Sequence, residues 1–233
     1  CVRLLQRKKR TTRMNHSVLL VIALILLSGC GPSSDTPQSG AVEPAITEAS
    51  ARMPLPDYFD CLRENGGVVI AAHRGGPAPG YPENAIETMQ FNFDNGVRVF
   101  EIDVAETRDG VLTLMHDDRL NRTTTGRGYV SDISWEELSG LTLVDNDDRH
   151  TRFSPPKLTD ALIWARNSGA ILELDRKKTT SFANMAKAVY AAGAEENVIM
   201  ISYNDDEAAE IAAIDPHFMM TASARGGRDI AAL

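Results

Sequence analysis

The sequence predicts an α/β fold based on a (β/α)8 barrel, with about six of its eight strands present. Short apolar runs alternate with helical segments from residue 68 onward, and such alternation is typical of a parallel sheet. Polar clusters follow several of these runs, as they do at the active edge of barrel enzymes. A complete barrel has about 250 residues, whereas the alternating region lies within 54–233. We therefore expect a barrel truncated at its C-terminus, with a complete doubly wound sheet as the alternative.

Each predicted element is a run with apolar or helical character, bounded in most cases by Gly, Asn, Asp or Ser. Asp109-Gly110 supplies a hairpin turn before one of the strands, and Ser134 with Glu137 forms a capping box. In chain order the prediction comprises a strand at 68–72, a helix at 84–95, strands at 97–105 and 111–116, a short helix after Ser134, a helix capped by Thr159 and ending near 167, a strand at 170–174, a helix at 182–192, a strand at 198–202, a helix at 206–214 and a strand at 218–223.

The N-terminal segment has the pattern of an export signal. A basic stretch precedes ten apolar residues at 18–27, which are too few to span a bilayer as a helix. The run ends in Leu-Ser-Gly-Cys and resembles a bacterial lipobox, so 1–30 is predicted to be a signal peptide with lipidation at Cys30. Residues 31–53 are rich in Ser, Pro, Ala and Thr and are predicted to be a tether. We expect an exported protein anchored to a bacterial membrane, facing the periplasm or the cell surface, with an uncleaved signal anchor as the alternative.

Composition and charge restrict the classes of partner. The chain is 43% hydrophobic and 24% charged, which is ordinary for a soluble globular protein, and its formal net charge is -8. Bulk nucleic-acid binding needs a basic surface, so this charge argues against it. A small phosphorylated molecule held by one or two local cations remains compatible with the charge.

Two histidines follow predicted strands. His73 and Arg74 come directly after the run 68–72, and His116 ends the run 111–116. A histidine transfers protons near neutral pH, and an arginine offers a planar fork for phosphate. A single histidine at a strand end is more often structural, so the pair carries the prediction.

Carboxylates also gather at predicted strands. Glu101 and Asp103 lie two residues apart and share one face, where they repel each other unless a cation lies between them. A hard divalent ion is the natural partner for such a pair. Glu173, Asp175 and Lys177 share a face of a later strand in the same way. Solvated polar faces or salt bridges at strand ends would explain each cluster alone, but together they favour phosphoryl chemistry.

Two stretches, HRGGPAPGYPENAIETMQ and FEIDVAETRDGVLTLMHDDRLNRTTTGRG, resemble the opening signature of the glycerophosphodiester phosphodiesterase family. The resemblance covers about residues 68–205 and implies a TIM barrel of the phosphatidylinositol-phosphodiesterase-like type. It also implies an insertion that begins near His116 and runs towards Pro156. The implied reaction is hydrolysis of a glycerophosphodiester to an alcohol and glycerol 3-phosphate. A lysophospholipase D-like activity and a non-catalytic phosphodiester-binding lipoprotein are the alternatives.

The resemblance also implies a role for each site residue. Glu173 is a rival to Asp175, because the family more often has Glu at the position that Asp175 occupies. The implied assignments are His73 and His116 as the acid/base pair, Glu101, Asp103 and Asp175 as ligands of one Ca²⁺ or Mg²⁺ ion, Arg74 and Lys177 as phosphate contacts, and Glu83 and Asn84 as supporting residues.

Overall fold

The computed structural model describes residues 53–221. The predicted signal peptide, its lipidation site Cys30 and nearly all of the predicted tether lie outside the described residues. Between residues 53 and 221, no helix combines the length and apolar character needed to cross a membrane.

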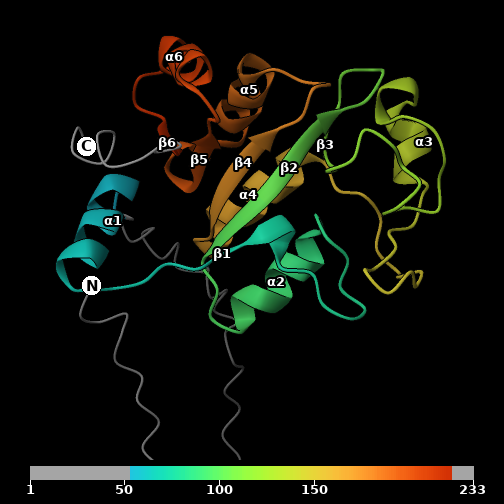
Figure 1. Cartoon of the computed structure of the whole chain (residues 1–233), viewed down its shortest axis with the longest axis horizontal. Helices are drawn as coiled ribbons and strands as arrows, with labels where there is room; N and C mark the ends of the chain where they lie inside the picture. The colour runs from blue at the N-terminus through green and yellow to red at the C-terminus, as the bar shows by residue number, and fades with distance from the viewer. Residues whose placement is uncertain (1–52, 222–233) are drawn as a thin grey trace, which may run out of the picture. The chain divides into compact units, whose positions relative to one another are not determined.

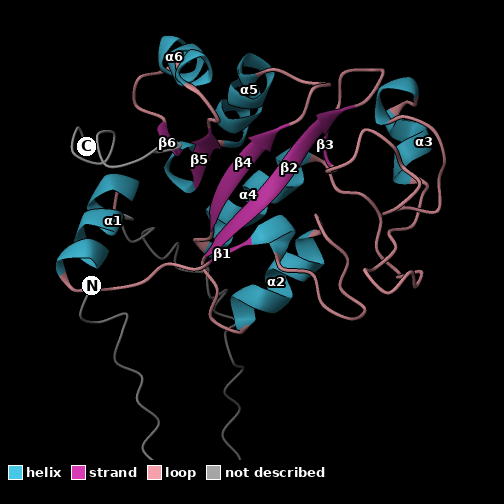
Figure 2. Cartoon of the chain, viewed as in Figure 1, coloured by secondary structure: helices cyan, strands magenta, loops and turns pink. Residues whose placement is uncertain are grey.

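Helices and strands alternate along the described part of the chain (Figures 1 and 2). The helix α1, which comes first, was not predicted. In chain order the elements are α1 (Leu55–Glu64), β1 (Ala71–Ala72), α2 (Ile86–Asp94), β2 (Val99–Glu106), β3 (Leu112–Leu114), α3 (Trp135–Ser139), α4 (Leu158–Ser168), β4 (Ile171–Arg176), α5 (Phe182–Ala192), β5 (Val198–Ile201), α6 (Asp205–Ile214) and β6 (Met219–Thr221).

The strands form one sheet in the order β1-β2-β4-β5-β6, and each neighbouring pair on this path is parallel. The predicted α/β alternation is therefore confirmed. The remaining strand, β3, pairs antiparallel with β2 as the second arm of a hairpin. Gly110 in the turn has φ +80°, a conformation that glycine adopts without strain. The six predicted strands thus comprise five parallel strands and one hairpin arm.

One face of the sheet is covered by helices. Phe100 and Ile102 on β2 and Leu172 on β4 are fully buried in the main apolar cluster. The helices α4 and α5 contribute residues to the same cluster and pack against each other. The helix α4 begins after Lys157 as its N-cap, so the predicted cap Thr159 lies inside the helix instead.

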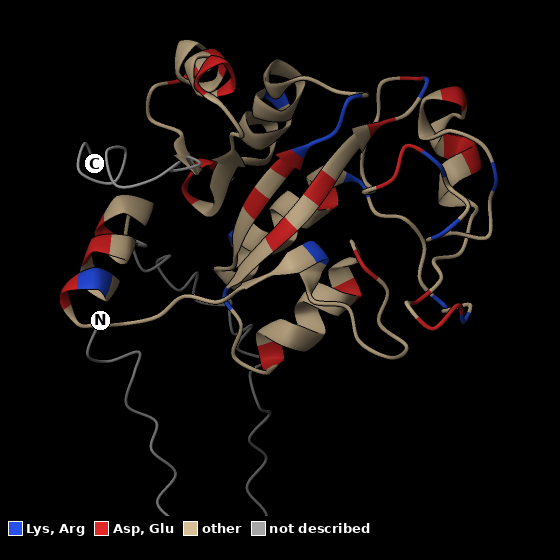
Figure 3. Cartoon of the chain, viewed as in Figure 1, with Lys and Arg blue, Asp and Glu red and all other residues tan. Residues whose placement is uncertain are grey.

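The opposite face of the sheet changes from apolar to acidic along its strands. At the strand starts, Val99, Ile171 and Ile199 pack with Leu55 of α1. One step further along, Glu101 on β2 lies beside Glu173 on β4, and the next step pairs Asp103 with Asp175. The red bands across β2 and β4 in Figure 3 show these two acidic levels. The helix α1 therefore closes the apolar end of this face and leaves the acidic end for chemistry.

The insertion at 116–156, between β3 and α4, contributes no strand to the sheet. It has its own small apolar cluster, which includes Leu120, Val130 and Leu138. Its one α-helix, α3, carries the predicted capping box, with Ser134 and Glu137 each bonded to the other's backbone amide. The insertion is thus a folded segment with little regular structure.

Candidate active site

Three carboxylates converge at the acidic end of the sheet. Pairing of β2 with β4 sets Asp103 beside Asp175, and Glu101 lies one level below on the same face. Each of the three residues offers an oxygen within 4.8 Å of the others, a spacing suited to one metal ion. The rival ligand Glu173 also lies on this face but does not belong to the group. The structure therefore brings together the ligand set Glu101, Asp103 and Asp175.

The surroundings of these three carboxylates disfavour the ionised form of Glu101. Burial and the nearby Asp103 raise the pKa of Glu101 to about 7, although the backbone N–H of Arg74 donates to it at 2.7 Å. Burial also raises the pKa of Glu173. A divalent cation would relieve the repulsion between Glu101 and Asp103.

Lys177 lies between two of the carboxylates. Its Nζ is 2.5 Å from Oδ1 of Asp103 and 2.6 Å from Oδ2 of Asp175. Burial alone lowers the pKa of Lys177, but its hydrogen bonds to the two carboxylates outweigh burial and raise it. Lys177 is therefore an ammonium ion that bridges two carboxylates of the site.

Asn84 and Arg74 hold the carboxylates in place from a neighbouring loop. Asn84 donates from Nδ2 to Oδ2 of Asp103 at 2.7 Å and accepts from the backbone N–H of Asp103 at 3.0 Å. Asn84 and Arg74 both have positive φ, 55° and 52°, and the N–H of Asn84 donates to the carbonyl of Arg74. Left-handed backbone at non-glycine residues costs about 1–3 kcal/mol each and is concentrated at functional sites. Asn84 thus holds Asp103 through two hydrogen bonds, and its supporting role in the site stays a prediction.

The two histidines approach this centre by different routes. His73 follows β1, is 74% exposed, and has Nε2 4.0 Å from Oε2 of Glu101. His116 follows β3, which is antiparallel to β2. The expectation that the carboxyl ends of parallel strands meet at one edge of the sheet therefore does not apply to His116, and another feature must bring it to the site. The hairpin instead folds back until the N–H of Met115 donates to the carbonyl of Asp103. His116 thereby reaches the level of the carboxylates.

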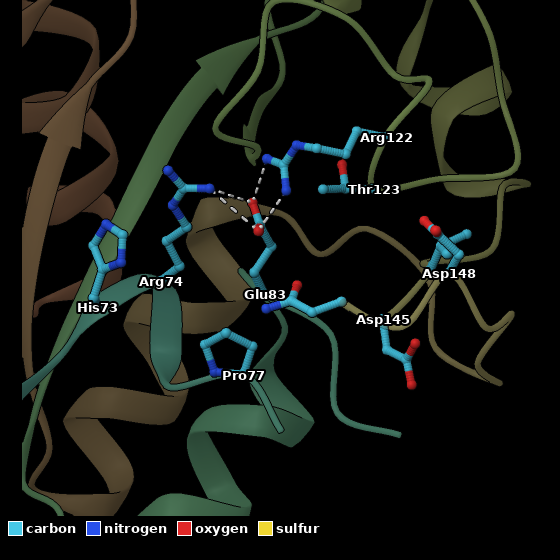
Figure 4. Close-up of a pocket in the computed structure, with 10 residues that line it drawn as sticks. His73, Arg74, Pro77, Glu83, Arg122, Thr123, Asp145 and Asp148 are labelled. Carbon is cyan, nitrogen blue, oxygen red and sulfur yellow. Dashed lines mark hydrogen bonds and ion pairs between the residues drawn. The ribbon is translucent and has the colours of Figure 1, made fainter. Parts of the chain in front are cut away.

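Each histidine lines a cavity of its own. The first cavity has a volume of about 410 Å³ and is lined by His73, Arg74, Glu83 and residues of the insertion (Figure 4). The second is lined by His116, and the site residues Asp175 and Lys177 lie in its wall. Arg74 thus lies in the wall of the first cavity, and Asp175 and Lys177 lie in the wall of the second.

Two residues of the site were not predicted. Asp117 accepts from Nδ1 of His116 at 2.7 Å, and Arg122 binds Asp117 through Nε and Nη2, both at 2.8 Å. Arg122 also binds Glu83, at 2.8 and 2.9 Å. Asp117 directly follows the predicted site residue His116 in the sequence, and this position could have identified it. No local pattern marks Arg122, because its contact with the buried Glu83 crosses 39 positions of the sequence.

Glu83 forms ion pairs with two arginines. Its side chain is 4% exposed, and Arg74 binds it through Nη1, 3.2 Å from each carboxylate oxygen. Burial raises the pKa of Glu83, but hydrogen bonds and charge from Arg122 and Arg74 outweigh it, and the pKa is lowered. The predicted phosphate contact Arg74 is therefore oriented by Glu83. Its Nε is buried 3.8 Å from Asp103, without a hydrogen-bond partner among the described residues.

Comparison with known proteins agrees with this geometry. Residues 73–217 match the model of the Glycerophosphoryl diester phosphodiesterase family. A glycerophosphoryl diester phosphodiesterase structure from Parabacteroides distasonis is 36% identical, with a TM-score of 0.65 over 70% of this chain and 56% of that one. The Bacillus subtilis protein YqiK is 30% identical over 64% of this chain and 63% of its own length. A glycerophosphodiester phosphodiesterase of Caldanaerobacter subterraneus is 26% identical over the same shares. The chain thus spans less than two thirds of each relative.

Proposed function

The chain belongs to the glycerophosphoryl diester phosphodiesterase family, and from this premise we propose that the protein hydrolyses glycerophosphodiesters to an alcohol and glycerol 3-phosphate. One observation carries the proposal. Two histidines, three clustered carboxylates and two cations come from β1, β2, the β2–β3 hairpin and β4 to one end of the sheet. That set contains the groups that hydrolysis of a phosphodiester requires.

We propose that the reaction depends on one divalent cation, Ca²⁺ or Mg²⁺. Glu101, Asp103 and Asp175 would hold it, since all three are oxygen ligands and the pKa of Glu101 is raised to about 7 by burial and by Asp103. When bound, such an ion polarises a phosphoryl oxygen. Lys177 and Arg74 add positive charge on either side of Asp103 and would neutralise phosphate oxygens.

The histidines would move the two protons of the reaction. His73 accepts a proton from the attacking hydroxyl, either of water or of the glycerol group itself, as its oxygen bonds to phosphorus. The bond from phosphorus to the alcohol oxygen breaks, and His116 donates a proton to that oxygen. Asp117 accepts a hydrogen bond from Nδ1 of His116 and would orient the ring, so we assign the role of proton donor to His116. If the glycerol hydroxyl attacks first, water then opens the cyclic phosphate to glycerol 3-phosphate.

The test is release of glycerol 3-phosphate from glycerophosphocholine by the full-length protein. We expect release that stops with EDTA, returns with Ca²⁺ or Mg²⁺, and is lost in His73→Ala and His116→Ala. No release by folded, metal-loaded protein would contradict the proposal. Lysophospholipids assayed in parallel would then detect the lysophospholipase D-like alternative, and inactivity on both would favour the phosphodiester-binding alternative.

We further propose that the protein is exported and lipid-anchored through Cys30, as the lipobox-like segment indicates. Labelling of the full-length chain with a radioactive fatty acid in a bacterial host tests this. We expect label in the wild type and none in Cys30→Ser. Equal labelling of both would contradict the anchor.

A further inference from the structure

An unbroken series of ion pairs joins the two halves of the site. It runs from His116 to Asp117, then to Arg122, Glu83 and Arg74. Figure 4 shows part of it, with Arg74 and Arg122 directed at the carboxylate of Glu83. At one end of the series is the proposed proton donor, and at the other the proposed phosphate contact.

Arg122 is the member that joins the halves. Its guanidinium makes two contacts with Asp117 and two with Glu83, all between 2.8 and 2.9 Å. The planar fork of an arginine matches a carboxylate in this paired way, whereas a lysine ammonium does not. Glu83 is buried, so its negative charge needs these partners.

In the described part of the chain, few contacts fix the ring of His116, although the backbone of this residue closely follows the paired strand β3. Arg122 belongs to the insertion, which adds no strand to the sheet. Among the described residues, the His116 ring makes one hydrogen bond, to Asp117, whose side chain is 30% exposed. Without Arg122, Asp117 would lose two contacts and turn more easily towards water.

We propose that Arg122 is a positioning residue that fixes the His116 imidazole relative to Arg74, so that proton donor and phosphate-binding cation face one substrate. This inference rests on the proposed function. An ionised carboxylate only accepts hydrogen bonds, so Nδ1 of His116 carries the proton that faces Asp117. In the doubly protonated ring, the other nitrogen, Nε2, carries the second proton, and this is the proton that would go to the leaving oxygen.

Nuclear magnetic resonance of ¹⁵N-histidine-labelled, full-length protein tests the positioning without any assay of activity. In the wild type we expect neutral His116 to carry its proton on Nδ1. In Arg122→Lys, which keeps the charge and loses the fork, we expect a mixture with the Nε2–H form. An unchanged Nδ1–H form in both Arg122→Lys and Arg122→Gln would overturn the proposal.

Kinetics with two leaving groups test the consequence. Glycerophosphocholine needs a protonated leaving group, whereas glycerophospho-4-nitrophenol does not. We expect Arg122→Lys to lose roughly 10–100-fold in kcat on the first substrate and only a few-fold on the second. The ratio of the two losses does not depend on the fraction of folded enzyme, so a folding defect alone would leave it at one.

The matched control is Arg149→Lys, because Arg149 is another arginine of the insertion. Its side chain is 68% exposed, and among the described residues its one salt bridge is with Asp147, at 3.5 Å. It should keep wild-type rates on both substrates. Equal losses on both substrates in Arg122→Lys would overturn the positioning role. A wild type that hydrolyses neither substrate would contradict the proposed function, while the resonance experiment would still decide the role of Arg122.

Discussion

The two halves of the site are held in place by different forces. In the sheet half, the register of β2 with β4 sets Asp103 beside Asp175 through backbone hydrogen bonds. In the insertion half, the ring of His116 and the side chain of Arg122 depend on ion pairs that reach across to Glu83. Backbone pairing follows from a short periodic pattern, whereas charged contacts between distant residues do not. The sheet half should therefore tolerate changes in its surroundings better than the insertion half.

Removal of His116 should produce the largest effect and shows whether the insertion half takes part in chemistry. We expect His116→Ala to lower kcat on glycerophosphocholine by about 10²–10⁴-fold, because the leaving alkoxide loses its proton donor. Rates measured on both leaving groups check the cause. A loss of the same size on glycerophospho-4-nitrophenol would contradict a role in protonation.

Removal of one charge from the sheet half should have the next largest effect. Asp103 is 1% exposed and contacts Lys177 and Asn84, so Asp103→Asn removes a proposed metal ligand and leaves Lys177 less well paired. We expect a loss of at least about 10²-fold in kcat. Calorimetric titration with Ca²⁺ should show weaker binding in the same variant. Asp160→Asn, at an exposed residue in the first turn of α4, is the control and should bind Ca²⁺ normally.

The raised pKa of Glu101 predicts a dependence of stability on pH in metal-free protein. Glu101 ionises near pH 7 in the folded state and near 4.5 when unfolded. Its stabilising contribution is therefore fully present below pH 4.5 and is lost as pH rises through about 7. The loss is at most about 3 kcal/mol in the free energy of unfolding.

Urea unfolding in EDTA at about pH 5 and about pH 8 measures this loss. Wild type should lose more stability over this range than Glu101→Gln, which does not titrate. Identical losses of stability in the two proteins would show that ionisation of Glu101 does not destabilise the folded state.

The smallest effect should come from the capping box of α3, which lies in the insertion but away from the ion-pair series. We expect Ser134→Ala to lower the free energy of unfolding by about 1 kcal/mol, because the amide of Glu137 loses its acceptor. The rate on glycerophosphocholine should not change. A large loss of activity would mean that the whole insertion, and not its charged residues, positions the site.

The sequence could predict the sheet half, and the hairpin that leads to His116, because their signals are local. Alternation placed Glu101 and Asp103 on one face, and the Asp109-Gly110 turn placed the hairpin that carries His116. Alternation could not choose between Glu173 and Asp175, since both face the same way. The two residues differ in their position along β4, since Asp175 lies further along the strand from the apolar cluster around Leu55 than Glu173 does.

Other features had weaker signals or none. The helix α1 was missed although Leu55, Tyr58 and Phe59 follow the spacing of a helix face, because they adjoin a segment rich in polar residues. Arg122 could not be found from local pattern, because its partners Glu83 and Asp117 meet it only in the folded chain.

The most direct test of the account is an anomalous difference map from crystals of the full-length protein grown with Mn²⁺. We predict one peak bonded by Glu101, Asp103 and Asp175, with Nζ of Lys177 moved away from its position between Asp103 and Asp175. A map with no peak at these carboxylates, or with Mn²⁺ bound only elsewhere, would contradict the metal-dependent site.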